Sequence, residues 1–146
     1  MFRPALIFID NHIGLGRRLR LLAGIIPTPA IALLVRELHC DGGIVISASH
    51  NPPEYNGIKL FDSQGFKLPD AIEAEIEDHI DHPEKLTLKT GTEIGKVHVS
   101  TTAVEDYVAH ILSTVEERAA AGLKVAIDCA NGSASATARK LFTALG

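Results

Sequence analysis

Residues 43–52 read G-I-V-I-S-A-S-H-N-P, and this stretch decides the fold. Its first half is a short apolar run bounded by turn formers, which is typical of a strand buried on both faces in a largely parallel sheet. Asn51 and Pro52 then impose a turn, so Ser49 and His50 would be held on a fixed loop at the carboxyl end of that strand. Open α/β sheets bind their ligands at this end.

The segments on either side of this stretch predict alternating strands and helices. Before it, residues 19–23 suit a strand, and a helix capped by Thr28 runs to Leu38. After it, residues 57–61 suit a strand, and Pro69 opens a helix whose isoleucines recur every four residues while its acidic face meets water.

The carboxyl-terminal half continues this alternation. Residues 82–99 are polar and predict a connection or a short hairpin, and a capping box at 102–105 opens a long helix that ends near 121–122. A buried strand over 123–127 and a helix over 134–145 complete the chain. The order predicts an α/β fold, with a mixed, largely parallel sheet and flanking helices.

Composition and charge narrow the class of protein. The 146 residues are 46% hydrophobic and 22% charged, which is typical of a soluble globular protein. A net charge of -4 leaves no basic face for a nucleic acid, and no apolar run approaches the roughly 20 residues that span a bilayer. The start of the chain does not resemble a signal peptide. We therefore expect a cytoplasmic protein with no nucleic-acid or membrane partner.

The cysteines and two neighbouring histidines suggest no metal site. Cys40 and Cys129 lack zinc spacing and predict two buried, reduced thiols. His79 and His82 form an H-x-x-H pair beside acidic residues, which is more typical of a solvated helix end than of a metal ligand pair.

Three side chains near the decisive stretch could support phosphoryl transfer. This reaction needs a nucleophilic oxygen, a proton donor or acceptor and a cation, and Ser49, His50 and Lys59 could fill these roles. The alternative is structural: an Asn-Pro turn capped by a serine hydroxyl, beside an ordinary surface lysine. A serine hydrolase fits less well, because no G-x-S-x-G elbow surrounds Ser47 or Ser49.

A set of motifs then resembles a known family. Residues 24–30, 43–52, 56–59 and 65–69 resemble, in order and spacing, the first domain of the α-D-phosphohexomutases, and residues 125–132 resemble the opening of the second domain. The resemblance implies an unmatched segment over 1–18, a truncated domain 1 over 19–121 that contains a phosphoserine loop, and the first strand and helix of domain 2 over 122–146.

The motif forms I-S-A-S-H-N-P, N-G-I-K-L-F and K-L-P-D most resemble the phosphoglucosamine mutase branch, which interconverts glucosamine 6-phosphate and glucosamine 1-phosphate. Phosphomannomutase and phosphoglucomutase relatives share much of this pattern. The substrate implied is therefore a hexosamine phosphate, with a hexose phosphate as the alternative.

The resemblance also assigns roles to the three side chains. Ser49 matches the serine that is phosphorylated, donates its phosphoryl group to the sugar phosphate and recovers one from the bisphosphate intermediate. Its phosphate would also bind Mg²⁺, the implied cofactor. Lys59 matches a lysine that assists proton transfer at the sugar hydroxyl, and His50 matches the neighbour that arranges the loop.

Parts of the family pattern do not occur in this sequence. We find no D-x-D-x-D magnesium loop, and no sugar-recognition or phosphate loop. Arg17, Arg18 and Arg20 suit a solvated basic turn better than a phosphate contact. We therefore expect the chain alone to lack appreciable mutase activity, which robust turnover in a coupled assay would contradict.

Two rival functions follow from this departure. One is a truncated, non-catalytic product, whose uncovered sheet edges and apolar helix faces would favour a homo-oligomer or association with the missing domains. The other is a phosphosugar-binding module without chemistry, in which Ser49→Ala would leave affinity nearly intact.

Overall fold

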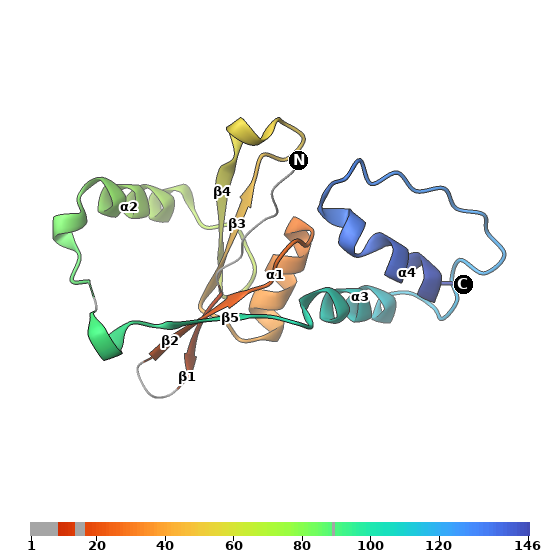
Figure 1. Cartoon of the computed structure of the whole chain (residues 1–146), viewed down its shortest axis with the longest axis horizontal. Helices are drawn as coiled ribbons and strands as arrows, with labels where there is room; N and C mark the ends of the chain where they lie inside the picture. The colour runs from red at the N-terminus through yellow and green to blue at the C-terminus, as the bar shows by residue number, and fades with distance from the viewer. Residues whose placement is uncertain (1–8, 14–16, 89) are drawn as a thin grey trace.

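A five-stranded mixed sheet organises the chain, as seen in the computed structural model, which describes residues 9–13, 17–88 and 90–146 (Figure 1). Most of the unmatched segment 1–18, and the side chains of Arg17 and Arg18, lie outside the described residues. In the order β4-β3-β1-β2-β5, the strands are Gly57–Asp62, Gly42–Ser47, Ile9–Ile13, Arg17–Leu22 and Lys96–Val99. Together with the helices, this sheet confirms the predicted α/β class.

Strand direction differs from the expected largely parallel sheet. Among the described strands, β1 pairs antiparallel with β2 and with β3, β3 pairs antiparallel with β4, and only β2 and β5 are parallel. Residues 48–56 alone connect β3 to β4, whereas a parallel crossover needs about a dozen residues or more. The expectation was wrong in this detail, because a continuous apolar run does not determine strand direction. Strand β3 is also not buried on both faces as predicted: Gly43 and Val45 are buried, whereas Ile44 and Ile46 are half-buried.

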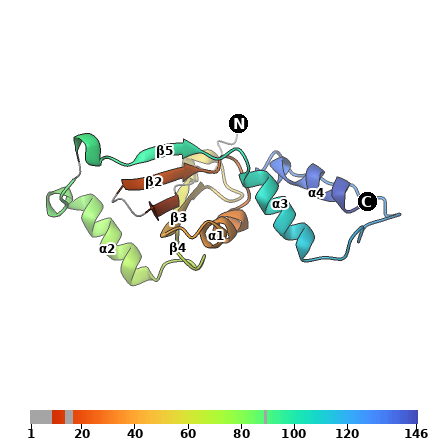
Figure 2. The same cartoon turned by 90° about the horizontal axis from the view of Figure 1, so that it is seen from below.

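The described residues form four α-helices, which are α1 (Thr28–Glu37), α2 (Asp70–Asp81), α3 (Ala103–Ser113) and α4 (Ala138–Ala144). Helix α1 lies against the sheet, whereas α2 and α4 lie away from it (Figures 1 and 2). Helix α1 packs against β3, and α3 contacts both α1 and α4. Helices α2 and α4 lie at opposite ends of the molecule in both views. None of the helices in the described part of the chain is long and apolar enough to cross a membrane.

The core lies between α1, β3 and the start of α3. Its fully buried side chains include Ile31, Leu34 and Val35 of α1 and Val45 of β3. Burial of apolar surface stabilises the folded state by roughly 25 cal/mol for each Å² removed from water. Among the described residues, this cluster therefore makes the main hydrophobic contribution to the free energy of folding. Cys40 is buried as expected, whereas Cys129 is only half-buried.

The helix starts differ from those expected. Pro27 occupies the N-cap position of α1, so Thr28 is the first helical residue and does not cap the helix. At α3, the Ser100 hydroxyl accepts hydrogen bonds from the backbone N–H groups of Thr102 (3.3 Å) and Ala103 (3.0 Å). Ser100 therefore caps the start of this helix, the role that we assigned to Thr102. Helix α3 then ends at Ser113, short of the predicted 121–122.

Two further predictions were wrong. Residues 123–127 form no ladder with any described strand, and their apolar side chains are exposed: Leu123 by 68%, Val125 by 50% and Ile127 by 46%. Conversely, the polar connection 82–99 contains β5, which was missed because K-V-H-V is short and exposed. Helix α2 formed as predicted, but it buries none of its residues.

A pair of glycine substitutions tests the packing of the turn after β4. Gly24 and Gly65 both have left-handed backbone (φ 76° and 80°), but only at Gly65 would a Cβ meet another atom, 2.3 Å from the Ala32 carbonyl oxygen. Alanine at either position costs about 1–2 kcal/mol for its backbone. We expect Gly65→Ala to lose at least about 1 kcal/mol more than Gly24→Ala in urea unfolding, because the clash adds overpacking strain. Equal losses would contradict this close approach.

Acid should weaken the docking of α4. Lys140 on α4 forms an ion pair with Glu105 on α3, and this hydrogen bond lowers the pKa of the Glu105 carboxyl below its usual 4.5. A lowered folded-state pKa gives stability that is present above the unfolded value and is lost as the pH falls through the folded value. Amide exchange in α4, corrected for intrinsic rates, should therefore accelerate below about pH 4.5. In Lys140→Ala, amide exchange in α4 should already be fast at neutral pH and should show no further acceleration in acid. If the acid acceleration is retained in this variant, the Lys140–Glu105 ion pair does not cause it.

Candidate functional site

The loop after β3 holds Ser49 in an unusual backbone conformation. Ser49 has a φ of 58°, in the left-handed region that residues other than glycine rarely adopt. Its backbone N–H donates to the Ser47 hydroxyl (3.0 Å), and the Asn51 N–H donates to the Ala48 carbonyl (3.0 Å). Strained residues of this kind persist where surrounding contacts over-determine them, and they cluster at functional sites.

The Ser49 hydroxyl lies beside a histidine ring. Ser49 Oγ and His50 Nδ1 are 3.5 Å apart, which is long for a hydrogen bond, and both side chains are exposed to solvent. A small rotation would bring them to hydrogen-bonding distance, with donor and acceptor set by the histidine tautomer. The pair can therefore orient the hydroxyl or exchange its proton.

The loop forms one wall of a cavity of about 580 Å³, which is a typical size for a small-molecule site. Three segments that lie far apart in the sequence line it: the start of α1, the β3 end with its loop, and a turn near residue 131. The lining residues are Ile25, Ile26, Thr28, Ile46, Ser47, Ala48, Ser49, His50, Pro53, Asn56, Ala130, Asn131, Gly132, Ser133, Ser135 and Ala136.

The cavity suits a ligand with one anionic end. Among the described residues, the lining includes no Asp or Glu, and His50 is the only titratable side chain there. Helix α1 begins at Thr28 in the cavity wall, with no acidic residue in its first turn. The start of α1 carries partial positive charge, which favours a phosphate placed near Ser49. Its N–H groups contribute little to this effect, because Pro29 has none and the Ala30 N–H is already hydrogen-bonded within the first turn.

The structure brings Ser49 and His50 together but does not place Lys59 among the residues that line this cavity. Lys59 lies on β4, opposite the buried Val45, and is half-buried. By contrast, Thr28 and Asn131 line the cavity, and sequence reasoning did not select them. Residues 125–132 were matched to the opening of the second domain, but no local signal indicated that they would meet the serine loop.

The described residues do not assemble a magnesium site. Among them, no group of three or more His, Cys, Asp or Glu side chains could hold a metal ion. Mg²⁺ prefers octahedral oxygen ligands, usually with one or two carboxylates, whereas the cavity offers hydroxyl and amide oxygens. His82 lies near Glu84 (3.2 Å) and Asp78 (3.9 Å), whereas His79 is half-buried and its Nδ1 is shielded from solvent.

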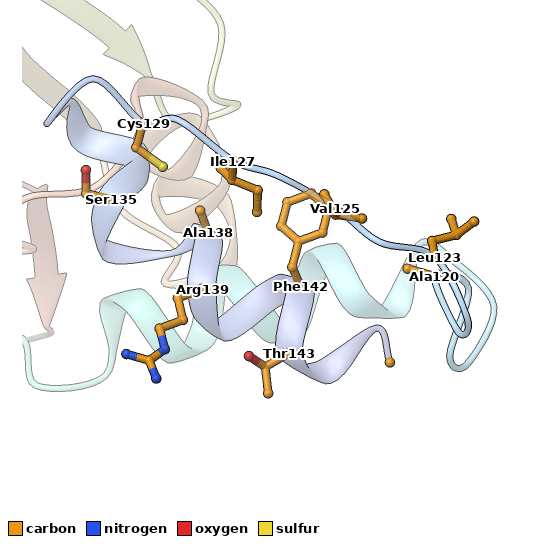
Figure 3. Close-up of a pocket in the computed structure, with 11 residues that line it drawn as sticks. Ala120, Leu123, Val125, Ile127, Cys129, Ser135, Ala138, Arg139, Phe142 and Thr143 are labelled. Carbon is orange, nitrogen blue, oxygen red and sulfur yellow. The ribbon is translucent and has the colours of Figure 1, made fainter.

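A second cavity, of about 530 Å³, lies between the extended segment 123–129 and α4 (Figure 3). The Phe142 ring points towards this segment, beside Val125 and Ile127. Ser49 and His50 do not line this cavity. Because Ser49 and His50 line the first cavity, we assign the chemistry to that cavity.

Residues 14–87 match the family described as phosphoglucomutase/phosphomannomutase, alpha/beta/alpha domain I. The chain therefore belongs to this family of phosphohexomutase domains, as the sequence motifs suggested. The match includes Ser49, His50 and Lys59. The division into domains at 121–122 is not tested by this match and stays a prediction.

Within this family, the chain is similar to proteins named phosphoglucosamine mutase. It is 50% identical to that of Moorella thermoacetica over 127 residues, which are 86% of the chain and 28% of the relative. It is 50% identical to that of Clostridium acetobutylicum over 124 residues (84% and 28%), and 51% identical to that of Acetivibrio thermocellus over 124 residues (84% and 27%). The chain thus spans little more than a quarter of the length of these relatives.

Replacing Ser49 tests the backbone strain separately from the chemistry. Ser49→Ala keeps a Cβ in the left-handed region, whereas Ser49→Gly removes it. We expect the glycine variant to be about 1 kcal/mol more stable than the alanine variant in urea unfolding, because the strain is worth about 1–2 kcal/mol and part of it is offset by unfolded-state entropy. At most sites an alanine variant is more stable than a glycine variant. If Ser49→Ala is more stable than Ser49→Gly, the backbone at this position is not strained.

Proposed function

We propose that this chain provides the phosphoryl-carrying serine of a phosphosugar mutase that interconverts glucosamine 6-phosphate and glucosamine 1-phosphate. The observation that carries the proposal is the position of Ser49, on a strained loop at the wall of a cavity of sugar-phosphate size, beside the start of α1. The names of the relatives supply the substrate class. A hexose phosphate is the alternative substrate.

The proposed cycle has two phosphoryl transfers. In the first, the bond between the phosphoserine oxygen and phosphorus breaks, a bond forms from phosphorus to a sugar hydroxyl, and the proton of that hydroxyl passes to the departing serine oxygen. In the second, Ser49 Oγ gives up its proton as it attacks the other phosphate of the bisphosphate, the bond from that phosphorus to the sugar oxygen breaks, and the sugar oxygen takes up a proton as it leaves. Each transfer moves negative charge that nearby dipoles must stabilise.

The residues around Ser49 supply what these steps need. His50 is close enough to orient Oγ or to exchange its proton, and the α1 start places partial positive charge at the phosphoryl end. We assign to Lys59 the assistance of proton transfer at the sugar hydroxyl, on the family resemblance alone. Because Lys59 does not line the cavity, this role requires its side chain to move towards the cavity.

The ligands of magnesium and the remaining substrate contacts would come partly from outside the described residues. A phosphate on Ser49 would offer one oxygen to Mg²⁺, and further ligands would have to come from other polypeptide, so no step above depends on the ion. We also propose a cytoplasmic setting. We further propose that this part of the protein associates with polypeptide corresponding to the rest of the relatives' length, or forms a homo-oligomer.

Transfer from a bisphosphate tests this function directly. We expect the purified chain, mixed with glucosamine 1,6-bisphosphate, to gain one phosphoryl group on the Ser49 peptide, as read by intact mass and peptide mapping. Ser49→Ala should gain none. Ser63→Ala, a matched substitution in the exposed turn after β4, should be labelled like the parent protein.

Two outcomes would overturn the proposal. One is a parent protein that stays unmodified while its fold is intact by circular dichroism. The other is a phosphoryl group that maps to a different residue and survives in Ser49→Ala.

A further inference from the structure

Ser47 is the last residue of β3, where the strand passes into the loop 48–56 that carries Ser49. It pairs with Gly57 at the end of the β3–β4 ladder, so the sheet fixes the position of its backbone. Because side chains alternate along a strand, Ser47 lies on the same face as the fully buried Val45, which packs in the core with α1. Ser47 is half-buried and lines the cavity. It therefore joins a rigid element to the candidate site.

The backbone of Ser49 is attached to this side chain. The Ser49 N–H donates to Ser47 Oγ (3.0 Å), and within the described part of the chain this is the only hydrogen bond of the Ser49 backbone. The bond from the Asn51 N–H to the Ala48 carbonyl closes the turn around Ser49 without touching it. The left-handed conformation of Ser49 is costly and sets the direction of Oγ, so the Ser47 hydroxyl is the contact that holds the nucleophile.

A hydroxyl is not the only group that can make such a contact. At Asp62 and Asp128 a carboxylate accepts the N–H of the residue two positions later (2.9 and 2.8 Å), whereas at Ser100 a hydroxyl does so (3.3 Å). Both kinds of side chain stabilise local turns through these bonds. Backbone geometry alone therefore does not require an uncharged acceptor at position 47.

The charge of the acceptor matters at this position because of its neighbour. The acceptor oxygen of residue 47 lies against the Ser49 N–H, in a cavity whose described lining contains no Asp or Glu. A carboxylate there would repel a phosphoryl group on Ser49, because charges a few Å apart interact strongly where water is partly excluded. A hydroxyl holds the loop without this repulsion.

We propose that Ser47 is a positioning residue for phosphoryl transfer at Ser49. Its hydroxyl fixes the backbone of the nucleophile to the end of β3, and its neutrality keeps negative charge away from the phosphoryl group. Ser47 acts through Ser49 and takes no part in making or breaking bonds. This inference rests on the proposed function, because it takes Ser49 as the phosphoryl carrier.

The first experiment removes the hydroxyl while keeping the shape of the side chain. Ser47→Thr and Ser47→Val introduce isosteric residues that both suit a strand, but only threonine keeps the acceptor. With glucosamine 1,6-bisphosphate as phosphoryl donor, Ser47→Thr should label Ser49 at close to the parent rate. In Ser47→Val the rate constant at saturating bisphosphate should fall about tenfold, because the nucleophile is misplaced, with the half-saturation concentration unchanged. Equal rate constants for the two variants would overturn the inference.

The conformation of Ser49 gives a readout that does not depend on the chemistry. A residue with positive φ shows a strong NOE between its own amide and α protons, because these protons lie close together. This NOE should be strong at Ser49 in the parent protein and in Ser47→Thr. It should be weak in Ser47→Val, whose loop is free to relax to negative φ. A strong NOE in Ser47→Val would show that other contacts hold Ser49, and the positioning role would be wrong.

A second pair of variants tests the role of charge. Ser47→Asn and Ser47→Asp both offer an Oδ1 acceptor and differ by one negative charge. Ser47→Asn should label Ser49 at close to the parent rate, whereas Ser47→Asp should be slower by about tenfold or more, and added salt should narrow this gap. Ser63→Asp adds the same charge in the exposed turn after β4, outside this cavity, and should not slow labelling. Equal rates for Ser47→Asp and Ser47→Asn would contradict the role of the neutral acceptor.

The labelling experiment separates this inference from the proposed function. If the parent protein is labelled on Ser49 and Ser47→Val is labelled equally fast, the positioning role is wrong and the proposed function stands. If the folded parent protein is not labelled at all, both are wrong.

Discussion

The packing of α1 against β3 is the constraint on which the rest of the structure depends. Ile31 and Val35 of α1 are fully buried against β3, and at Gly43 a Cβ would lie only 2.6 Å from the Val35 side chain. The backbones of α1 and β3 therefore approach each other closely at Gly43. The β3 end and the α1 start line the same cavity, so this packing places the Ser49 loop beside a helix N-terminus.

Much of this framework could be predicted from the sequence, because it depends on local patterns. The buried run of β3, the turn at Asn51 and Pro52, and the apolar stripe of α1 each follow from short-range periodicity and turn chemistry. The strand directions could not be predicted in this way, since burial looks alike in parallel and antiparallel ladders. Residues 123–127 show the same limit, because a strand pattern forms a strand only where a partner lies alongside.

The candidate site likewise contains a part that local sequence patterns predict and a part that depends on distant contacts. Ser49 and His50 are neighbours in the sequence, so their pairing was predictable, and the family motif indicated their roles. Asn131 reaches the cavity from more than 80 residues away in the chain, and only the folded structure brings it there. The left-handed backbone of Ala130 has no signature in its residue type, in contrast to a glycine.

The proposed function requires that Ser49 carries a phosphoryl group during the working cycle. The most direct measurement is the phosphorylation state of this protein as isolated from its native source, mapped by mass spectrometry of its peptides. We expect a substantial fraction of molecules with one phosphoryl group, on the peptide that contains Ser49. Unmodified Ser49 in a preparation that interconverts the two glucosamine phosphates would contradict it.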